Sequence, residues 1–83
     1  MHFSQHKLYC VKKGSHGLDE ICTGSLWVCK HELFEYLCKD ADCFGEINTW
    51  RALEKYCEKN DIPLSFSTKH DMATFDTWSY FID

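Results

Sequence analysis

The order of strand-like and helix-like patterns along the chain constrains its fold more than any other feature of the sequence. Residues 6–12, HKLYCVK, alternate weakly between polar and apolar side chains, which is typical of a strand. Residues 18–28, LDEICTGSLWV, are predicted to form a second strand with a bend at Thr23-Gly24. The segment between them, residues 13–17, contains two glycines and is typical of a turn. The N-terminal part is therefore predicted to be a β-hairpin.

The middle of the chain changes to the helical period. In residues 47–60, INTWRALEKYCEKN, the apolar side chains recur every three or four positions and charged ones occupy the opposite side. Asn60 is expected to take the left-handed conformation at the end of this helix, and Pro63 prevents its continuation. The pattern predicts one amphipathic helix.

A shorter helix is predicted just before it. The segment VCKHELFEYLCKD has an apolar face, and Cys29 stands where a Ser or Thr N-cap is expected, with Glu32 three residues later as in a capping box. Residues 39–46 form the connection between the two helices, with Gly45 as its most adaptable position. A helical pair is therefore expected at the centre of the chain.

The C-terminal part returns to strand-like composition. Residues 63–67 are predicted to be a strand, 68–71 a turn and 73–82, ATFDTWSYFI, one last strand. A helix remains the alternative for this last segment, because Met72, Phe75, Trp78 and Ile82 also have helical spacing. The resulting β-β-α-α-β-β order predicts an α+β fold, an antiparallel sheet with two helices packed on one face. With 83 residues, positions 1–83 are expected to form one compact domain.

Charge and composition narrow the classes of function. Thirteen acidic residues exceed nine basic ones, giving a formal charge of -4, so direct binding of nucleic acid is not expected. The acidic balance suits a protein partner with a basic surface. The chain has no apolar run of membrane-spanning length and no secretory leader pattern, so no membrane association and a cytoplasmic location are expected.

The six cysteines raise two alternatives in which thiols carry the function. Zinc sites usually use paired ligands two to four residues apart, and only Cys38 and Cys43 approach that spacing. A structural zinc site built from Cys29, His31, Cys38 and Cys43 is therefore kept as an alternative to the expectation of no cofactor. A thiol-dependent enzyme is the second alternative, with Cys29 activated by a helix N-terminus. The competing interpretation is that the cysteines are small core residues.

Aromatic and acidic side chains provide the main candidate site. Phe, Tyr and Trp make up 16% of the residues, more than a core of this size can enclose, so some rings are expected at the surface as anchors of an interface. Rings and carboxylates are most concentrated after residue 31 and near the C-terminus. The predicted partner-binding residues are Glu32, Glu35, Tyr36, Asp40, Asp42, Phe44, Asp76, Trp78 and Tyr80.

These observations predict a small, non-enzymatic protein-binding module with no catalytic residues. The preferred hypothesis is an acidic inhibitor of a host protein or of a nucleic-acid-processing complex such as a nuclease, because an acidic surface complements the basic sites with which such enzymes hold nucleic acid. Anti-defence proteins of phages and mobile elements, including anti-CRISPR inhibitors, are of this general type. This is an analogy of type, and no family resemblance underlies it. A homodimeric structural protein remains a third alternative, because both faces of the last predicted strand carry aromatic rings.

Overall fold

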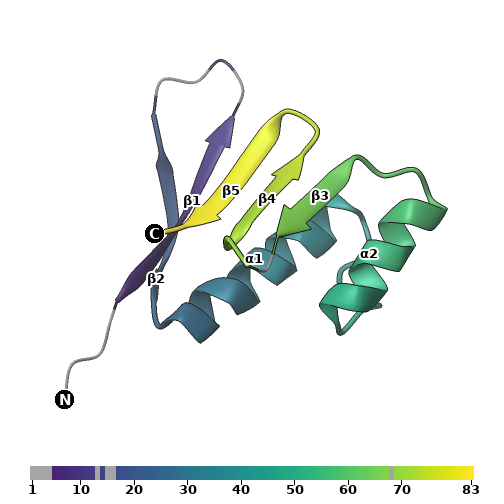
Figure 1. Ribbon diagram of the computed structural model, residues 1–83, viewed down its shortest axis with the longest axis horizontal. Coiled ribbons are helices and arrows are strands. Elements are labelled where there is room, and N and C mark those ends of the chain that lie inside the picture. The colour runs from purple at the N-terminus through teal and green to yellow at the C-terminus, as the bar shows by residue number, and fades with distance from the viewer. Residues whose placement is uncertain (1–4, 13, 15–16, 68) are drawn as a thin grey trace.

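The computed structural model describes residues 5–12, 14, 17–67 and 69–83. Its fold is α+β, with a five-stranded antiparallel sheet and two helices, so the predicted fold class is confirmed (Figure 1). The elements are β1 (His6–Lys12), β2 (Asp19–Gly24), α1 (Leu26–Asp40), α2 (Trp50–Lys59), β3 (Leu64–Ser67), β4 (Met72–Phe75) and β5 (Trp78–Ile82). The predicted turns at 13–17 and 68–71 fall partly outside the described residues.

The sheet has the strand order β2-β1-β5-β4-β3, and each neighbouring pair is antiparallel. Cys10 of β1 is paired with Tyr80 of β5, which in turn is paired with Ala73 of β4. Residues opposite each other in antiparallel strands share a face. This register therefore places all three side chains on the same side of the sheet, where each is buried.

The last predicted strand, 73–82, is wrong as a single element, because the structure divides it into β4 and β5. The two strands are joined by a turn of two residues, Asp76 and Thr77, and Phe75 is paired with Trp78 across it. Asp76 has φ 52°, a left-handed conformation that Asp adopts more easily than most residues. Without a glycine at the turn, the strong strand propensity on both sides concealed the reversal. The hairpin adds a fifth strand.

Helix α1 begins earlier than predicted. Ser25 is its N-cap, because the backbone N–H of Val28 donates to Ser25 Oγ at 3.2 Å. The predicted continuation of the second strand through residue 28 is therefore wrong, and Cys29 is not the cap but lies one turn inside the helix. The β-branched and aromatic residues that open the helix favour strands and obscured the boundary.

Helix α2 is confirmed in type but begins at Trp50, with Thr49 as N-cap accepting from the Ala52 N–H at 3.1 Å. Asn60 is its C-cap with φ -105°, so the expectation that Asn60 is left-handed is wrong. The left-handed residue is the next one, Asp61, with φ 52°. Gly45, in the connection before this helix, has φ 88°, which is a conformation that glycine tolerates best.

Both helices end in the same backbone motif. In α1 the N–H of Cys43 donates to the carbonyl of Cys38 at 2.8 Å, around Asp42 with φ 58°. In α2 the N–H of Ile62 donates to the carbonyl of Cys57 at 2.9 Å, around Asp61. This is the Schellman motif, in which the residue after the left-handed position commonly makes an apolar contact with a residue one turn earlier in the helix. Two of the chain's cysteines, Cys38 and Cys57, occupy equivalent places in it.

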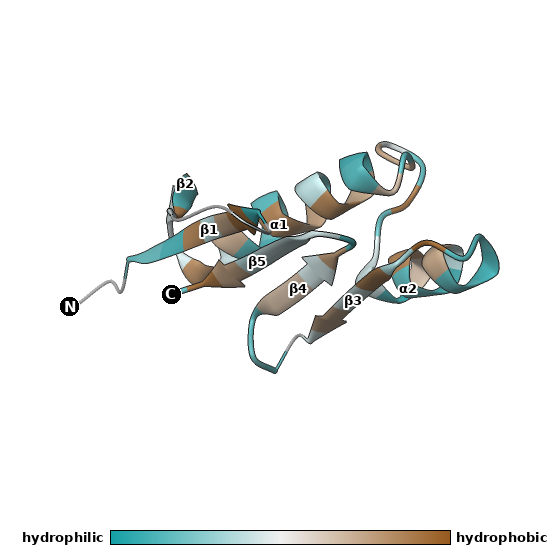
Figure 2. Ribbon diagram, turned by 90° about the horizontal axis from the view of Figure 1, so that it is seen from above, coloured by the Kyte–Doolittle hydropathy of each residue, from teal (hydrophilic) through white to brown (hydrophobic). Residues whose placement is uncertain are grey.

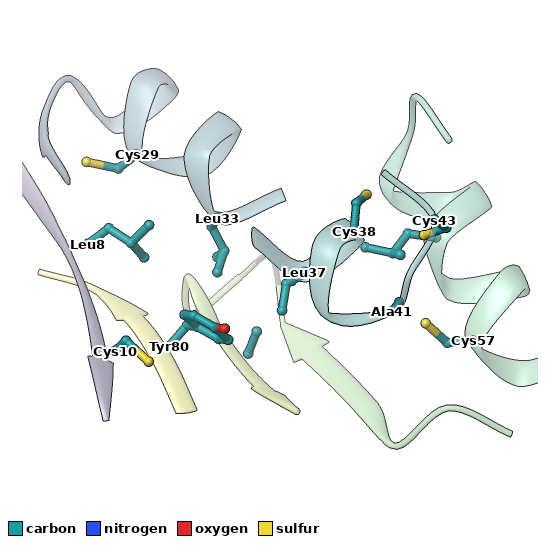
Figure 3. Close-up of a cluster of buried hydrophobic side chains, with 12 residues drawn as sticks. Leu8, Cys10, Cys29, Leu33, Leu37, Cys38, Ala41, Cys43, Cys57 and Tyr80 are labelled. Atoms are coloured by element: carbon teal, nitrogen blue, oxygen red, sulfur yellow. The ribbon is translucent and has the colours of Figure 1, made fainter. Parts of the chain in front are cut away.

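The core lies between the sheet and the helices. Figure 2 shows α1 on one side of the sheet, and no helix of the described residues lies on the other side. The fully buried side chains include Leu8, Leu37 and Tyr80, and Figure 3 shows them spread along the layer between α1 and the strands. At the β3 end, the ring of Trp50 contacts Phe34 at 5.1 Å and Phe66 at 5.0 Å between ring centroids. These three rings join α1, α2 and the sheet.

The cysteines belong mainly to this core. All six lie in the described part of the chain, each is a free thiol, and five are buried: Cys10, Cys29, Cys38, Cys43 and Cys57. Burial in apolar surroundings is common for free cysteine, which packs as a small hydrophobic residue. The high cysteine content of the chain is therefore explained largely by packing in the core.

Candidate functional site

A groove of about 440 Å³ lies between the C-terminal half of α1 and one end of the sheet. It combines aromatic rings with both signs of charge. Its lining residues are Cys10, Lys12, Asp19, Ile21, Tyr36, Lys39, Asp40, Trp78 and Tyr80. Sites that bind a ligand or a partner side chain commonly have this composition, an apolar lining with a few oriented polar groups.

The local periodicities of helix and strand bring these side chains together. Tyr36 and Asp40 are four residues apart and therefore lie on one side of α1. Trp78 and Tyr80 are two residues apart on β5 and share the face of the sheet that α1 covers. The neighbouring strand β1 adds Lys12, which is paired with Trp78. Helix and sheet thus supply opposite walls of the groove.

Tyr80 and Asp40, which both line the groove, are joined by a hydrogen bond. The Tyr80 hydroxyl donates to Asp40 Oδ2, and burial, together with this bond and the nearby carboxylate, raises the pKa of Tyr80 far above its usual value. The hydroxyl is therefore neutral. An ionised carboxylate has about four acceptor positions, so Asp40 retains acceptor capacity after binding Tyr80.

The rings of the groove already have cations beside them. Lys12 Nζ lies 4.3 Å from the centroid of the Trp78 ring. Lys39 Nζ lies 5.6 Å from the Tyr36 ring and 5.0 Å from the Phe44 ring. Aromatic faces attract ammonium and guanidinium groups at such distances, by about 0.5–1 kcal/mol where the site is exposed. Both lysines are exposed, so another cation can replace them at modest cost.

Four predicted partner-binding residues meet in this groove: Tyr36, Asp40, Trp78 and Tyr80. Tyr80 is one of the predicted partner-binding rings, and the expectation of a surface ring at this position is wrong, because only 1% of the residue is accessible. Trp78 and Tyr36 are partly exposed.

The other predicted residues lie elsewhere. Glu35 and Phe44 line a second hollow of about 270 Å³ beside α1, and Phe44 is 55% exposed. Glu32, Asp42 and Asp76 line neither hollow. Asp42 and Asp76 have positive φ and occupy positions that the backbone requires, which gives them a structural role apart from any binding.

Sequence reasoning missed a highly exposed large hydrophobic residue, Trp27, which is 73% accessible. Its ring stacks on His31 at 5.6 Å between centroids, and His31 Nε2 lies 3.0 Å from Glu35 Oε1. These three residues are spaced four apart along the outer surface of α1. That spacing would have revealed them if the helix had been predicted to begin at Leu26 instead of after Val28.

The four residues of the zinc alternative are spread along α1 and beyond it. Cys29 and Cys38 are nine residues apart on the helix, which is about 13 Å along its axis. His31 lies on the exposed surface, whereas the three cysteines are buried. Among the described residues, no group of three or more His, Cys, Asp or Glu side chains is arranged to hold a metal ion.

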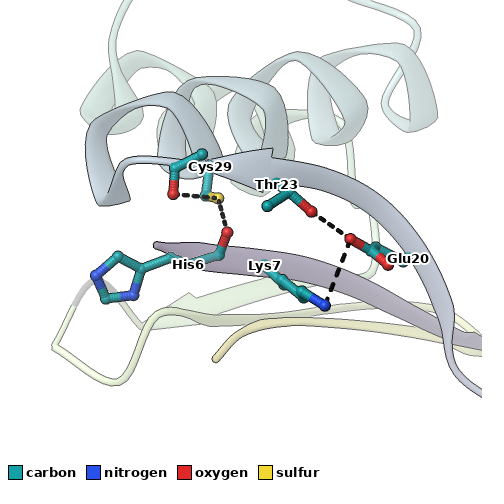
Figure 4. A network of polar contacts seen from close by, with 6 residues as sticks. His6, Lys7, Glu20, Thr23 and Cys29 are labelled. Carbon is teal, nitrogen blue, oxygen red and sulfur yellow. Dashed lines mark hydrogen bonds and ion pairs between the residues drawn. The ribbon is translucent and has the colours of Figure 1, made fainter. Parts of the chain in front are cut away.

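The thiol environments oppose ionisation. The Cys29 thiol donates to the carbonyl of His6 at 3.4 Å, as Figure 4 shows, and burial raises its pKa. Burial and the neighbouring Cys43 raise the pKa of Cys38 to about 12. A reactive cysteine needs the opposite environment, one that favours the thiolate.

The described helices include none with the length and apolar character needed to cross a membrane. Comparison of the chain with known protein families, curated proteins and solved structures found no match. The geometry of the groove therefore carries the functional argument.

Proposed function

We propose that this chain is a non-enzymatic protein-binding module and that its groove receives a basic side chain of a partner protein. The observation that carries the proposal is the meeting of Trp78, Tyr36 and Asp40 in one hollow. Two ring faces and a carboxylate form the combination that an arginine side chain can use, stacking on a ring while hydrogen-bonding to the carboxylate.

Two lysine side chains of the groove support the proposal that its ligand is basic. Lys12 and Lys39 lie over the rings, so the ring faces are oriented to receive a positive group. Asp19 and Asp40 balance the two lysines in the groove lining, and the whole chain supplies the net negative charge, formally -4. A basic partner would be steered toward this surface and would displace exposed lysines rather than core residues.

The proposal extends to the kind of partner. Proteins that hold nucleic acid present clusters of arginine and lysine, which are the groups this groove would accept. We therefore propose an inhibitor that occupies such a basic site in a nucleic-acid-processing complex, as the anti-defence proteins of phages and mobile elements do. The acidic balance of the chain and the absence of a catalytic motif in its sequence support this choice.

The proposal is tested first with a short arginine-rich peptide and the intact protein. The indole N–H signal of Trp78 is followed by NMR, with those of Trp27 and Trp50 as internal references. We expect the Trp78 signal to shift in a saturable manner, with an apparent Kd that weakens as salt is added. Shifts of all three indoles in parallel, or none, would reject the groove as the binding site.

The second step identifies the natural partner by affinity capture from the source cell. Trp78→Ala is compared with the matched control Trp27→Ala, which removes an equally large ring from the outer surface of α1. Loss of a central anchor typically costs about 2 kcal/mol, about a thirtyfold change in affinity. Retention of the same protein by the Trp78 variant would contradict the proposal. A captured nuclease or nucleoprotein would support the inhibitor, and a captured protein without a basic site would argue against it.

A further inference from the structure

The face of the sheet that points away from the helices carries an apolar ridge. Tyr9 and Val11 of β1 and Phe81 of β5 project to this side, opposite to the buried residues that alternate with them. The rings of Tyr9 and Phe81 lie 5.2 Å apart between centroids. Met72 of β4 is paired with Phe81 and is 51% exposed. The ridge therefore crosses three strands on a side where Figure 2 shows no helix.

The same face has a shallow hollow beside the ridge. It has a volume of about 150 Å³ and lies over β3 and β4, where the side chains directed to this face are those of Ser65, Ser67, Met72 and Thr74. Three of these four are small hydroxyl residues. Ridge and hollow thus adjoin on one face, with Met72 at their boundary, the ridge toward β1 and the hollow toward β3.

The charges of this face are confined to one corner. Lys7 and Glu20 lie 4.0 Å apart there, and Asp83 follows β5 and is paired with Lys7 through backbone hydrogen bonds. Between this corner and β3, the described strand residues on the face are uncharged. Charge depletion around an apolar centre distinguishes interface cores from ordinary surface.

From this geometry we propose that the face joins two copies of this chain in a two-fold homodimer. A chain with a charge of -4 repels its own copies, so self-association favours a face with little net charge. A two-fold axis running parallel to the strands, between β5 and β4, places β1 of one copy against β3 of the other. The ridge of each copy then enters the hollow of its partner, as an isologous interface requires.

The same axis also places the charges favourably. It sets Asp83, at the end of β5, against the turn that joins β3 to β4 in the other copy, where Lys69 is exposed. Glu20 lies on β2, beyond the edge of the covered area, and keeps Lys7 as its partner. Two such sheets would pack about 10 Å apart, as in other face-to-face β structures.

The size of the face determines the expected strength. The axis overlaps four strands of each copy, which at a spacing of about 4.8 Å and a length of about 16 Å give roughly 300 Å² in projection. Stable interfaces bury about 800 Å² of accessible surface on each partner, so this one is smaller than the standard size and the adjoining turns have to contribute. We expect half-association at roughly 10–100 μM, near the weak end of the range for such interfaces.

Sedimentation equilibrium of the full chain between about 1 μM and 1 mM tests the proposal. The wild type should change from monomer to dimer across this range. Thr74→Lys places a charge in the hollow at an exposed position, and Phe81→Glu places one on the ridge. Each should raise the half-association concentration at least about tenfold, because a charge would be left unpaired in the interface. Circular dichroism checks that each variant is folded.

A mixing experiment distinguishes this arrangement from nonspecific contact. In the two-fold interface β5 of one copy faces β4 of the other, so the carboxylate introduced by Phe81→Glu comes within reach of the ammonium group introduced by Thr74→Lys. An equimolar mixture of the two variants should therefore form heterodimers at concentrations where each variant alone stays monomeric. Trp27→Ala should leave association unchanged. A wild type that stays monomeric to about 1 mM, an unaffected Thr74→Lys variant or a failed rescue would each overturn the proposal. The proposed binding groove lies on the other side of the sheet. A negative result for the dimer therefore does not affect the proposed function, and a negative result for the groove does not affect the dimer.

Discussion

The hydroxyl of Tyr80 donates a hydrogen bond to the carboxylate of Asp40, and this bond fastens β5 to the last turn of α1. The two residues are 40 positions apart in the chain. Their bond lies between the buried ring of Tyr80 and the partly exposed Asp40, at the boundary between core and groove. One contact therefore both stabilises the packing of helix on sheet and fixes the orientation of a carboxylate in the proposed binding site.

Removing this hydroxyl should destabilise the protein. Tyr80→Phe keeps the buried ring but deletes the donor to a charged acceptor, and we expect the free energy of unfolding to fall by about 2 kcal/mol. Urea unfolding followed by circular dichroism measures the change. Asp40→Asn is the control, because its amide oxygen still accepts and the loss should be smaller. Equal stability of wild type and Tyr80→Phe would show that the bond contributes nothing in solution.

The stability of the protein should decline at alkaline pH. Burial raises the pKa of Cys38 from 9.0 to about 12, so the unfolded chain releases this proton at lower pH than the folded chain. Stability is therefore fully present below pH 9 and is lost as pH rises from 9 to 12, by about 1 kcal/mol per pH unit from this thiol. Burial also raises the pKa of Cys10, Cys29, Cys43 and Cys57, which adds in the same direction.

Urea unfolding at pH values from about 7 to about 11 checks this expectation, with reducing agent present throughout. Cys38→Ala provides the comparison. It should be less stable at about pH 7, because it leaves a small cavity in the core, yet its stability should fall less steeply above about pH 9. Parallel profiles for the two proteins would mean that Cys38 does not titrate abnormally.

Much of the fold was predictable because its periodicities are local. The apolar face of α2 and the alternation in β1 identify those elements without reference to the rest of the chain. The β4–β5 turn was not predictable in the same way, since Asp76 replaces the glycine that usually marks a reversal with positive φ. The beginning of α1 was concealed because Trp27 and Val28 favour strands by residue type, whereas the Ser25 cap starts the helix before them.

The candidate site was predictable only in part. Residue type singled out Tyr36, Asp40 and Trp78, but the strand pairing that brings β1 beside β5 joins positions about 70 residues apart. No local pattern shows that Lys12 lies over the Trp78 ring. The sequence also does not show why each acidic residue stands where it does. Asp42 takes the left-handed conformation at the end of α1, whereas Asp40 accepts a hydrogen bond from the Tyr80 side chain.

Replacing the left-handed aspartate after either helix by glycine should stabilise the protein. Asp42 and Asp61 have φ 58° and 52°, and each places a negative charge at the negative end of a helix dipole. Asp42→Gly and Asp61→Gly relieve both effects and should each raise the free energy of unfolding by about 0.5–1 kcal/mol. Thermal unfolding measures the gain, and Asp42→Ala, which keeps the Cβ atom, should instead destabilise. A loss on introducing glycine would show that the Asp side chain makes a stabilising contact.

The N-cap of α1 gives a direct test of where the helix begins. Ser25 Oγ accepts the N–H of Val28, so Ser25→Ala leaves that donor without its partner and should lower the free energy of unfolding by about 1 kcal/mol. Ser25→Asp should preserve or increase stability, because Asp caps equally well and its charge favours the positive end of the helix dipole. If the helix began after Cys29, as the sequence pattern predicts, Ser25 would lie in a strand and both substitutions would change stability by less than about 0.5 kcal/mol.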